Sequence, residues 1–151
     1  MTRRVHPAEL RKGRLATNPE RSALLRRVRQ KGTAPESAVQ SVLEALGYAF
    51  GTNVSGLPGS PDIVISNGST VVFVHGCFWH HHAKCPAAST PVSNAEFWTD
   101  KFAANMQRDR RNARELRSMG YQVITVWECQ TKTRIRRAQL QRRLARLLGR
   151  P

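Results

Sequence analysis

A short stretch of the chain, residues 74–85, holds most of the side chains that could carry chemistry. It reads VHGCFWHHHAKC, so thiols, imidazoles and two large aromatic rings lie close together. Thiolates and imidazoles are good ligands for zinc, and an imidazole that titrates near neutral pH can transfer protons. The stretch therefore predicts a metal site, a proton-transfer site, or both.

Three cysteines and one histidine form a candidate zinc site of the Cys₃His type: Cys77, His82, Cys85 and Cys129. Structural zinc ions are held in tetrahedral geometry by four such ligands. Cys129 follows a predicted strand, and it would lie beside Cys77 if that strand pairs in parallel with the strand before Cys77. The alternative is three unrelated buried cysteines, because free cysteine also packs as a small apolar residue.

Asp62 is the candidate ligand for a second metal ion. It follows a Gly- and Pro-rich segment, residues 55–61, and opens a predicted strand. A carboxylate suits Mg²⁺, which prefers oxygen ligands, and the backbone carbonyl of Val74 could join it. His75 and His80 could then transfer protons during phosphodiester hydrolysis. Taken alone, Asp62 could equally be a turn or cap residue.

Glu36 has two interpretations. The pattern TAPE at residues 33–36 is typical of a capping box, in which the Glu36 carboxylate would bond the backbone N–H of Thr33. The alternative is an acid that points into an active site. The residues alone favour the cap.

Phe78, Trp79 and Trp98 also have two interpretations. Large aromatic residues usually belong to the hydrophobic core, and the residues alone favour that role. The alternative is a wedge that enters DNA between base pairs, at a cost of a few kcal/mol per step that is lower at a mismatch.

The composition points to a nucleic-acid partner. The chain has 151 residues and a formal net charge of +15, which favours a polyanion over a generically solvated basic surface. No apolar run is long enough to span a bilayer, and the first residues lack the apolar core of a signal peptide. We therefore expect a cytoplasmic protein with no membrane partner.

The elements that must position these residues follow from periodicity and from turn signals. Asn67-Gly68 indicates a hairpin, and a strand that follows a long helix favours a parallel crossover. A capping-box pattern at residues 93–96 opens the long helix, which can break near Ala104. Helices are expected over residues 34–46, about 95–119 and from 132 onward, and strands over 48–54, 62–66, 70–74 and 121–127.

Two parts of the chain differ in character. Residues 1–32 are rich in arginine and predict a basic arm that orders on DNA, with a solvated tail as the alternative. Residues 33–151 predict a single domain of the α/β class.

The motifs together resemble those of the very short patch repair endonucleases, over about residues 33–129. They are LPGSPD at 57–62, HGCFWHHH at 75–82, EFW at 96–98, RDRR at 108–111 after Asn105, and VWEC at 126–129. Several separated motifs in the right order are far more specific than any one of them. The resemblance implies a restriction-endonuclease-like core, a mixed β-sheet flanked by helices, with a structural zinc site.

The resemblance also implies an activity. Members of that family use Mg²⁺ to nick the thymine-containing strand 5′ of a T:G mismatch, which arises when 5-methylcytosine deaminates. We therefore expect double-stranded DNA with a T:G mismatch as the substrate, general mismatch-repair proteins as partners, a monomer, and action at the bacterial nucleoid.

Roles for single residues follow from the same resemblance. It implies magnesium ligation by Asp62 and the Val74 carbonyl, catalysis by His80 with support from His75 and Glu36, Zn²⁺ ligation by Cys77, His82, Cys85 and Cys129, and a DNA wedge of Phe78, Trp79 and Trp98. For the wedge and for Glu36, the resemblance reverses the interpretation that the residues alone favour.

The sequence departs from related patterns in two places. The strand over residues 71–74 lacks the acidic-x-Lys motif of the wider nuclease superfamily, and histidines follow it instead. His82 and Cys85 are separated by one residue more than expected, so the loop between them is expected to bulge. The alternatives to the mismatch nickase are a restriction-like nuclease with another DNA target and a non-catalytic, zinc-containing DNA-binding module.

Overall fold

The structure, a computed structural model, describes residues 31–151. The arm predicted over residues 1–32 lies outside the described residues, apart from its last two. The described part contains the helices α3 (Ala34–Ala45), α4 (Ala95–Ser118) and α5 (Arg134–Leu148), the strands β1 (Phe50–Thr52), β2 (Ile63–Ile65), β3 (Thr70–His75) and β4 (Gln122–Trp127), and the short 3₁₀ helices η1 (Pro86–Ala88) and η2 (Glu128–Gln130).

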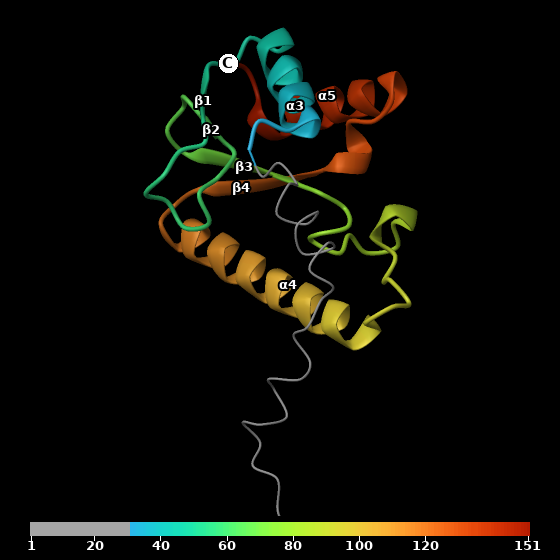
Figure 1. Ribbon diagram of the computed structural model, residues 1–151. Coiled ribbons are helices and arrows are strands. Elements are labelled where there is room, and N and C mark those ends of the chain that lie inside the picture. The colour runs from blue at the N-terminus through green and yellow to red at the C-terminus, as the bar shows by residue number, and fades with distance from the viewer. Residues whose placement is uncertain (1–30) are drawn as a thin grey trace, which may run out of the picture.

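The four strands form one mixed sheet in the order β1-β2-β3-β4 (Figure 1). The first two pairings are antiparallel and the third is parallel, with Thr70 opposite Gln122 and His75 opposite Trp127. The predicted hairpin and the predicted parallel crossover through α4 are thus confirmed. The first strand is shorter than the predicted 48–54.

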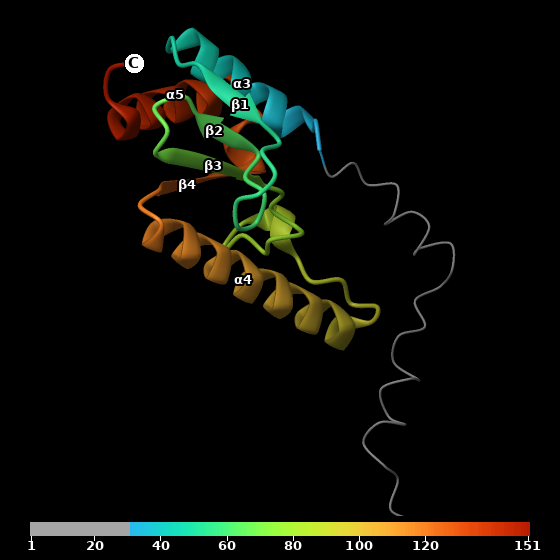
Figure 2. The ribbon, with the colours of Figure 1, turned by 90° about the vertical axis from the view of Figure 1, so that its left-hand side faces the viewer.

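The helices cover both faces of the sheet. Figures 1 and 2 show α3 and α5 on one face and α4 on the other. The main core lies between the sheet and the α3–α5 layer, because the apolar positions of both helices point there. Its buried side chains include Val39, Leu43, Ile63, Val72, Ile124, Leu140 and Leu144. Burial of each such side chain contributes roughly 1.5–3 kcal/mol.

The starts of α3 and α4 differ. Thr33 caps α3 as predicted, and its hydroxyl accepts the backbone N–H of Glu36. The capping box predicted for residues 93–96 is wrong, because Asn94 is the N-cap, adopts a left-handed conformation (φ 56°) and makes no side-chain cap bond.

The long helix α4 runs unbroken through Ala104, so the break considered there is also wrong. Gly120, which has a φ of +93°, follows the helix as the predicted stop. Among residues 31–151, no helix has both the length and the apolar character needed to cross a membrane.

Candidate active site and metal cluster

A cleft of about 1620 Å³ lies at the end of the sheet where β3 and β4 finish. Since β2 and β3 are antiparallel, the start of β2 lies beside the end of β3, and the start of α3 and the middle of α4 close the sides. The cleft is lined by Glu36, Asp62, Val74, His75, Trp79, His80 and Asp109, among others. The structure therefore brings the predicted catalytic residues into one cavity.

Asp62 stands immediately before β2 and faces β3. Its Oδ2 accepts the backbone N–H of Val74 at 2.7 Å, which fixes the carboxylate beside the residue expected to share a metal ion with it. Burial raises the pKa of Asp62 to about 6, the Val74 bond opposes this rise, and the charge of Glu36 adds to it. A cation bound beside this carboxylate would offset the effects of burial and of Glu36, so the setting suits a metal ligand.

His80 is held by a carboxylate. Its Nδ1 lies 2.6 Å from Oδ2 of Asp109 in α4, so the opposite ring nitrogen, Nε2, is left for chemistry. Burial acts to raise the pKa of Asp109, but the hydrogen bond and charge of His80 outweigh it and hold this pKa below its ordinary value. An ionised Asp109 can orient the His80 ring and stabilise its protonated form.

His75 lies face to face with His80. The two ring centroids are 3.8 Å apart and the planes differ by 4°. Burial, and after it the charge of His80, lower the pKa of His75 to about 4, against the charge of Asp109. At neutral pH His75 is therefore uncharged, and the stacked pair carries at most one positive charge.

Asp109 is a site residue that the reasoning from single residues missed. In the sequence it stands out only as part of the motif RDRR, and it lies 29 residues from its partner His80. One signal was available: Asn105 and Asp109 are polar residues one helical turn apart on α4. Asn105 is 7% exposed, and its Nδ2 donates to the carbonyl of Trp79 at 2.9 Å. Together they tie α4 to the loop that carries His80.

Glu36 combines parts of both interpretations. Its carboxylate accepts the backbone N–H of Gly32 at 2.9 Å and the hydroxyl of Thr33 at 3.0 Å. The cap is therefore present, although the bonded N–H is that of Gly32 and not that of Thr33. Glu36 is also 3% exposed, lines the cleft and raises the pKa of Asp62. It thus belongs to the electrostatics of the site.

A separate cluster of four side chains lies beside the cleft: Cys77, His82, Cys85 and Cys129. One candidate ligand atom from each lies within 4.8 Å of the others. The parallel pairing of β3 and β4 explains this, because it places residue 77 beside residue 129. The predicted meeting of Cys77 and Cys129 is confirmed as geometry.

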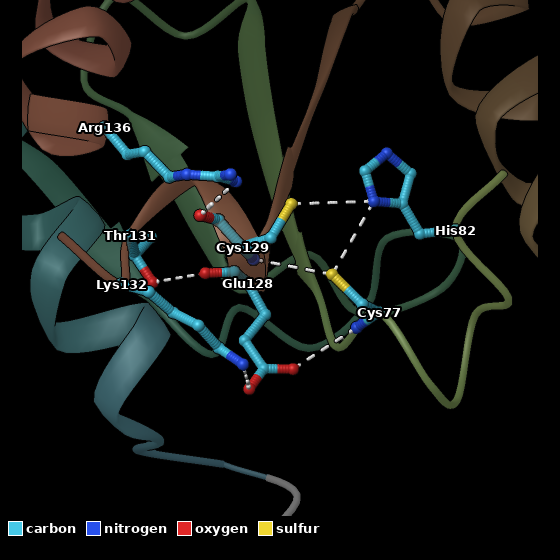
Figure 3. Close-up of polar contacts among 7 residues, drawn as sticks. All are labelled: Cys77, His82, Glu128, Cys129, Thr131, Lys132 and Arg136. Atoms are coloured by element: carbon cyan, nitrogen blue, oxygen red, sulfur yellow. Dashed lines mark hydrogen bonds and ion pairs between the residues drawn. The ribbon is translucent and has the colours of Figure 1, made fainter. Parts of the chain in front are cut away.

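The spacing inside this cluster fits a zinc ion. Nδ1 of His82 is 3.6 Å from the Sγ atoms of both Cys77 and Cys129 (Figure 3). Tetrahedral zinc with normal Zn–S and Zn–N bonds requires S···N separations of about 3.6 Å. Burial raises the pKa of Cys77 to about 12, so its sulfur would become a thiolate ligand only with the charge of a bound cation beside it. The donor set and its spacing therefore fit the metal.

Neighbouring groups hold the cluster in shape. The backbone N–H of Cys129 donates to Sγ of Cys77 at 3.4 Å, and Oε2 of Glu128 accepts the N–H of Cys77 at 3.3 Å (Figure 3). Trp127 stacks on His82 with ring centroids 4.1 Å apart. In the loop between His82 and Cys85, Lys84 adopts a left-handed conformation with a φ of 58°.

The three predicted wedge residues lie in one aromatic cluster, and two of them, Trp79 and Trp98, line the cleft. Trp98 is 3% exposed and packs against Phe78 and Phe102, with ring centroids 5.3 and 5.7 Å apart. Phe78 and Trp79 are only half buried, and Trp79 lines the cleft. The nearly buried Trp98 contacts both of the other two rings.

Comparisons with known proteins give one family. The family model of the DNA mismatch endonuclease Vsr matches residues 15–86. The DNA mismatch endonuclease Vsr of Escherichia coli K12 is 40% identical over 114 residues, which cover 76% of this chain and 72% of that protein.

Two nicking enzymes are similarly close. The type II nicking enzyme V.XorIIP of Xanthomonas oryzae pv. oryzae is 44% identical over 114 residues, 75% of this chain and 83% of its own. The enzyme V.NmeAIP of Neisseria meningitidis is 41% identical over 118 residues, 78% of this chain and 84% of its own.

Proposed function

Since the chain belongs to the family of Vsr DNA mismatch endonucleases, we propose that it nicks the thymine-containing strand of a T:G mismatch on the 5′ side of the thymine. Its class, a DNA endonuclease that nicks at mismatches, follows from the family. Within that class, we propose T:G as the mismatch and deaminated 5-methylcytosine as its source.

The observation that carries this proposal is the cleft, which combines a metal-type carboxylate, a histidine pair and an aromatic cluster. A binding module would need the aromatics but not Asp62, His75 and His80. Basic residues of α4, among them Lys101, Arg108 and Arg114, line the same cavity and suit a phosphate backbone.

Asp62 and the main-chain carbonyl of Val74 would hold Mg²⁺. When bound, the ion supplies Lewis-acid stabilisation of the negative charge that develops on the phosphate. Asp62 is largely buried and feels the negative charge of Glu36, and this setting favours a cation beside its carboxylate. The oxygen ligand also matches the preference of magnesium.

His80 would move the proton. Its Nδ1 is engaged by Asp109, so Nε2 faces the chemistry as a general base or acid. His75, which stacks on it and stays neutral at pH 7, would add no second positive charge beside it. Glu36 would set the electrostatic balance at Asp62 from the opposite wall.

Phe78 and Trp79 would enter the DNA beside the mismatch, with Trp98 behind them. Their partial exposure and the nearly buried Trp98 support this division. Unstacking costs less at a mismatched step than at a paired one, so a wedge favours mismatched substrates.

The fold and the second metal belong to the same proposal. We take the mixed sheet with helices on both faces as a restriction-endonuclease-like core, and the Cys₃His cluster as a structural Zn²⁺ site. We further propose that the enzyme acts as a monomer at the bacterial nucleoid in the cytoplasm, with general mismatch-repair proteins as partners. Family membership and the relatives' bacterial origin support these points.

A strand-specific nicking assay tests the proposed function. The substrate is an end-labelled duplex with one T:G mismatch, beside its fully paired counterpart, with magnesium or with chelator. We expect a magnesium-dependent nick 5′ of the mismatched thymine that Asp62→Ala abolishes without loss of DNA binding. Equal cutting of both duplexes would indicate a restriction-like nuclease. Binding without cutting in any divalent metal, over a set of flanking sequences, would indicate a DNA-binding module.

A further inference from the structure

The net charge of the chain is concentrated at its two ends. Residues 31–131, which contain the cleft and the metal cluster, hold eight Lys and Arg against eight Asp and Glu, so this part is formally neutral. Residues 132–151 hold eight Lys and Arg and no acid. The attraction to a polyanion that the charge of +15 implies cannot therefore come from the net charge of the cleft region.

In the described part of the chain, most of the excess charge lies on α5, which holds six of the eight Lys and Arg of residues 132–151. This helix covers the sheet on the face opposite α4 (Figure 2), and its buried side, with Leu140 and Leu144, contacts the core. Arg142 and Arg146 lie one turn apart on the opposite, exposed side. Within residues 31–151 neither makes a hydrogen bond or an ion pair, so both are available to an external anion.

Three other arginines of α5 are held in place by backbone carbonyls. Arg136 donates to the carbonyl of Cys129 at 3.2 Å, Arg137 to that of Thr131 at 2.8 Å, and Arg143 to that of Thr125 at 3.2 Å. Carbonyls orient a guanidinium but do not cancel its charge. These three positive charges are therefore fixed in position along β4 and the turn that follows it.

This arrangement does not help the helix itself. Positive side chains are unfavourable near a helix N-terminus, yet the first turn of α5 has no acidic residue and several arginines. Both α3 and α4 have an acidic residue in the first turn. The arginines of α5 therefore fit an external partner better than they fit helix stability.

We propose that the exposed arginine face of α5 binds the phosphate backbone of duplex DNA outside the mismatch. The helix has 15 residues and is about 22 Å long, which matches about six base pairs of duplex. It begins just after the metal cluster, where Arg136 reaches Cys129 (Figure 3), and this cluster adjoins the cleft. From there α5 runs back along β4, since Arg143 bonds to Thr125 and Gln122 to Leu147, so its exposed arginines would meet DNA well away from the mismatch.

The proposal rests on the proposed DNA-nicking function, and it adds a sequence-independent contact to it. Guanidinium groups on a rigid helix suit phosphates, and such contacts read no base. The contact would raise affinity for DNA of any sequence and steepen the dependence of that affinity on salt.

The test compares binding of a fully paired duplex over a range of salt concentrations. The variant is Arg142→Gln/Arg146→Gln in the full chain. A charge-preserving control is Arg142→Lys/Arg146→Lys. A charge-matched control is Lys84→Gln/Arg111→Gln, which removes two exposed cations from the neutral part, outside the lining of the cleft. Thermal melting checks that each variant is folded.

We expect the slope of log affinity against log salt to become shallower by about 2 in the glutamine variant, because each phosphate contact contributes about 0.9. The lysine variant should keep the wild-type slope, and the charge-matched control should change it by less than half as much. The nicking rate on T:G duplex at saturating protein should stay at the wild-type value.

Two results would overturn the inference. One is a glutamine variant whose slope equals that of the charge-matched control. The other comes from a parallel assay in which poly-glutamate replaces the duplex as a model acidic protein. A glutamine variant that binds DNA like the wild type but no longer binds poly-glutamate would mean that the face fits an acidic protein. Failure of the wild type to nick would count against the proposed function only, since the slopes are measured without nicking.

Discussion

Asp109 decides how His80 can act. A histidine on a loop has two possible tautomers and a mobile ring, and the 2.6 Å contact with Asp109 fixes both. The contact comes from α4, a rigid element tied to the same loop by Asn105. A general acid or base that is held by a neighbouring helix as well as by its own loop is better oriented than one held by its loop alone.

We therefore predict that Asp109→Asn lowers the nicking rate by about 100-fold or more, the typical contribution of general acid–base catalysis. The amide would bond to His80 without stabilising its protonated form. Single-turnover nicking with excess enzyme measures the rate, and melting measures the fold. Asp100→Asn, an exposed site on the same helix, is the control and should be neutral. A wild-type rate in Asp109→Asn would mean that the contact between Asp109 and His80 has no part in the mechanism.

Asp62 carries a cost in stability. Its pKa is about 6 in the folded protein, against an ordinary value of 3.8 for an exposed aspartate, so between these pH values the folded state binds more protons than the unfolded state. Stability therefore falls as pH rises from about 4 through about 6, and the full cost is present above pH 6. Sites that bind cations commonly trade stability for function in this way.

We predict that Asp62→Asn stabilises the magnesium-free protein at pH 8 by about 1–2 kcal/mol. A difference of about 2 between the folded and unfolded pKa corresponds to about 3 kcal/mol of stability, and partial solvation of the carboxylate reduces this figure. The gain should shrink as pH falls through 6 toward 4. Urea unfolding at several pH values measures it. Added magnesium should stabilise the wild type but not the variant, and a variant less stable at pH 8 would contradict the argument.

At the scale of elements, the metal cluster joins two segments that lie far apart in the sequence. The loop over residues 77–85 contains no helix or strand, and η2 follows the last strand. A tetrahedral ion between Cys77, His82, Cys85 and Cys129 would fasten this loop, and with it His80 and Trp79, to the edge of the sheet. The metal would thus affect catalysis indirectly, because it would hold His80 and Trp79 in position.

We predict that the purified protein holds one zinc per chain and that Cys129→Ser loses it. Because metal binding contributes directly to folding, the variant should melt well below the wild type, by more than 10 °C. Metal analysis and thermal melting measure these effects, and cobalt substitution should give the absorption bands of a thiolate site. A zinc-free variant with wild-type melting and nicking would contradict a structural role.

Sequence reasoning succeeded for elements with strong local patterns. Asn67-Gly68 between two β-branched runs predicted the hairpin, and the strand after α4 predicted the parallel pairing that brings Cys129 to Cys77. It failed where the outcome depends on packing. The contact of Asp109 with His80 depends on how α4 lies across the loop, which no short pattern encodes.

The wrong cap of α4 has a similar physical reason. The pattern at residues 93–96 is favourable locally, but Asn94 takes the left-handed conformation that the chain needs where it enters the helix. Asparagine tolerates that conformation better than most residues. Tertiary context thus overrides a correct local preference.

At the scale of the whole molecule, charge and chemistry are separated. The part with the cleft is formally neutral, whereas residues 1–30 hold nine Lys and Arg against two Glu. Attraction to DNA would thus come from the ends of the chain, and selection and cleavage from its centre. Such a division lets the enzyme hold any duplex while it tests each site for a mismatch.

The basic arm predicted over residues 1–32 gives the last test of this division. If Arg26, Arg27 and Arg29 bind phosphates, their replacement by Gln in the full chain should make the salt slope of DNA binding shallower by about 2–3. Replacement by Lys should preserve it. Nicking at saturating protein should change little, because the reacting groups lie in the neutral part. A slope equal to the wild type in the Gln variant would mean that the arm is a solvated tail, and the attraction to DNA would then depend on α5.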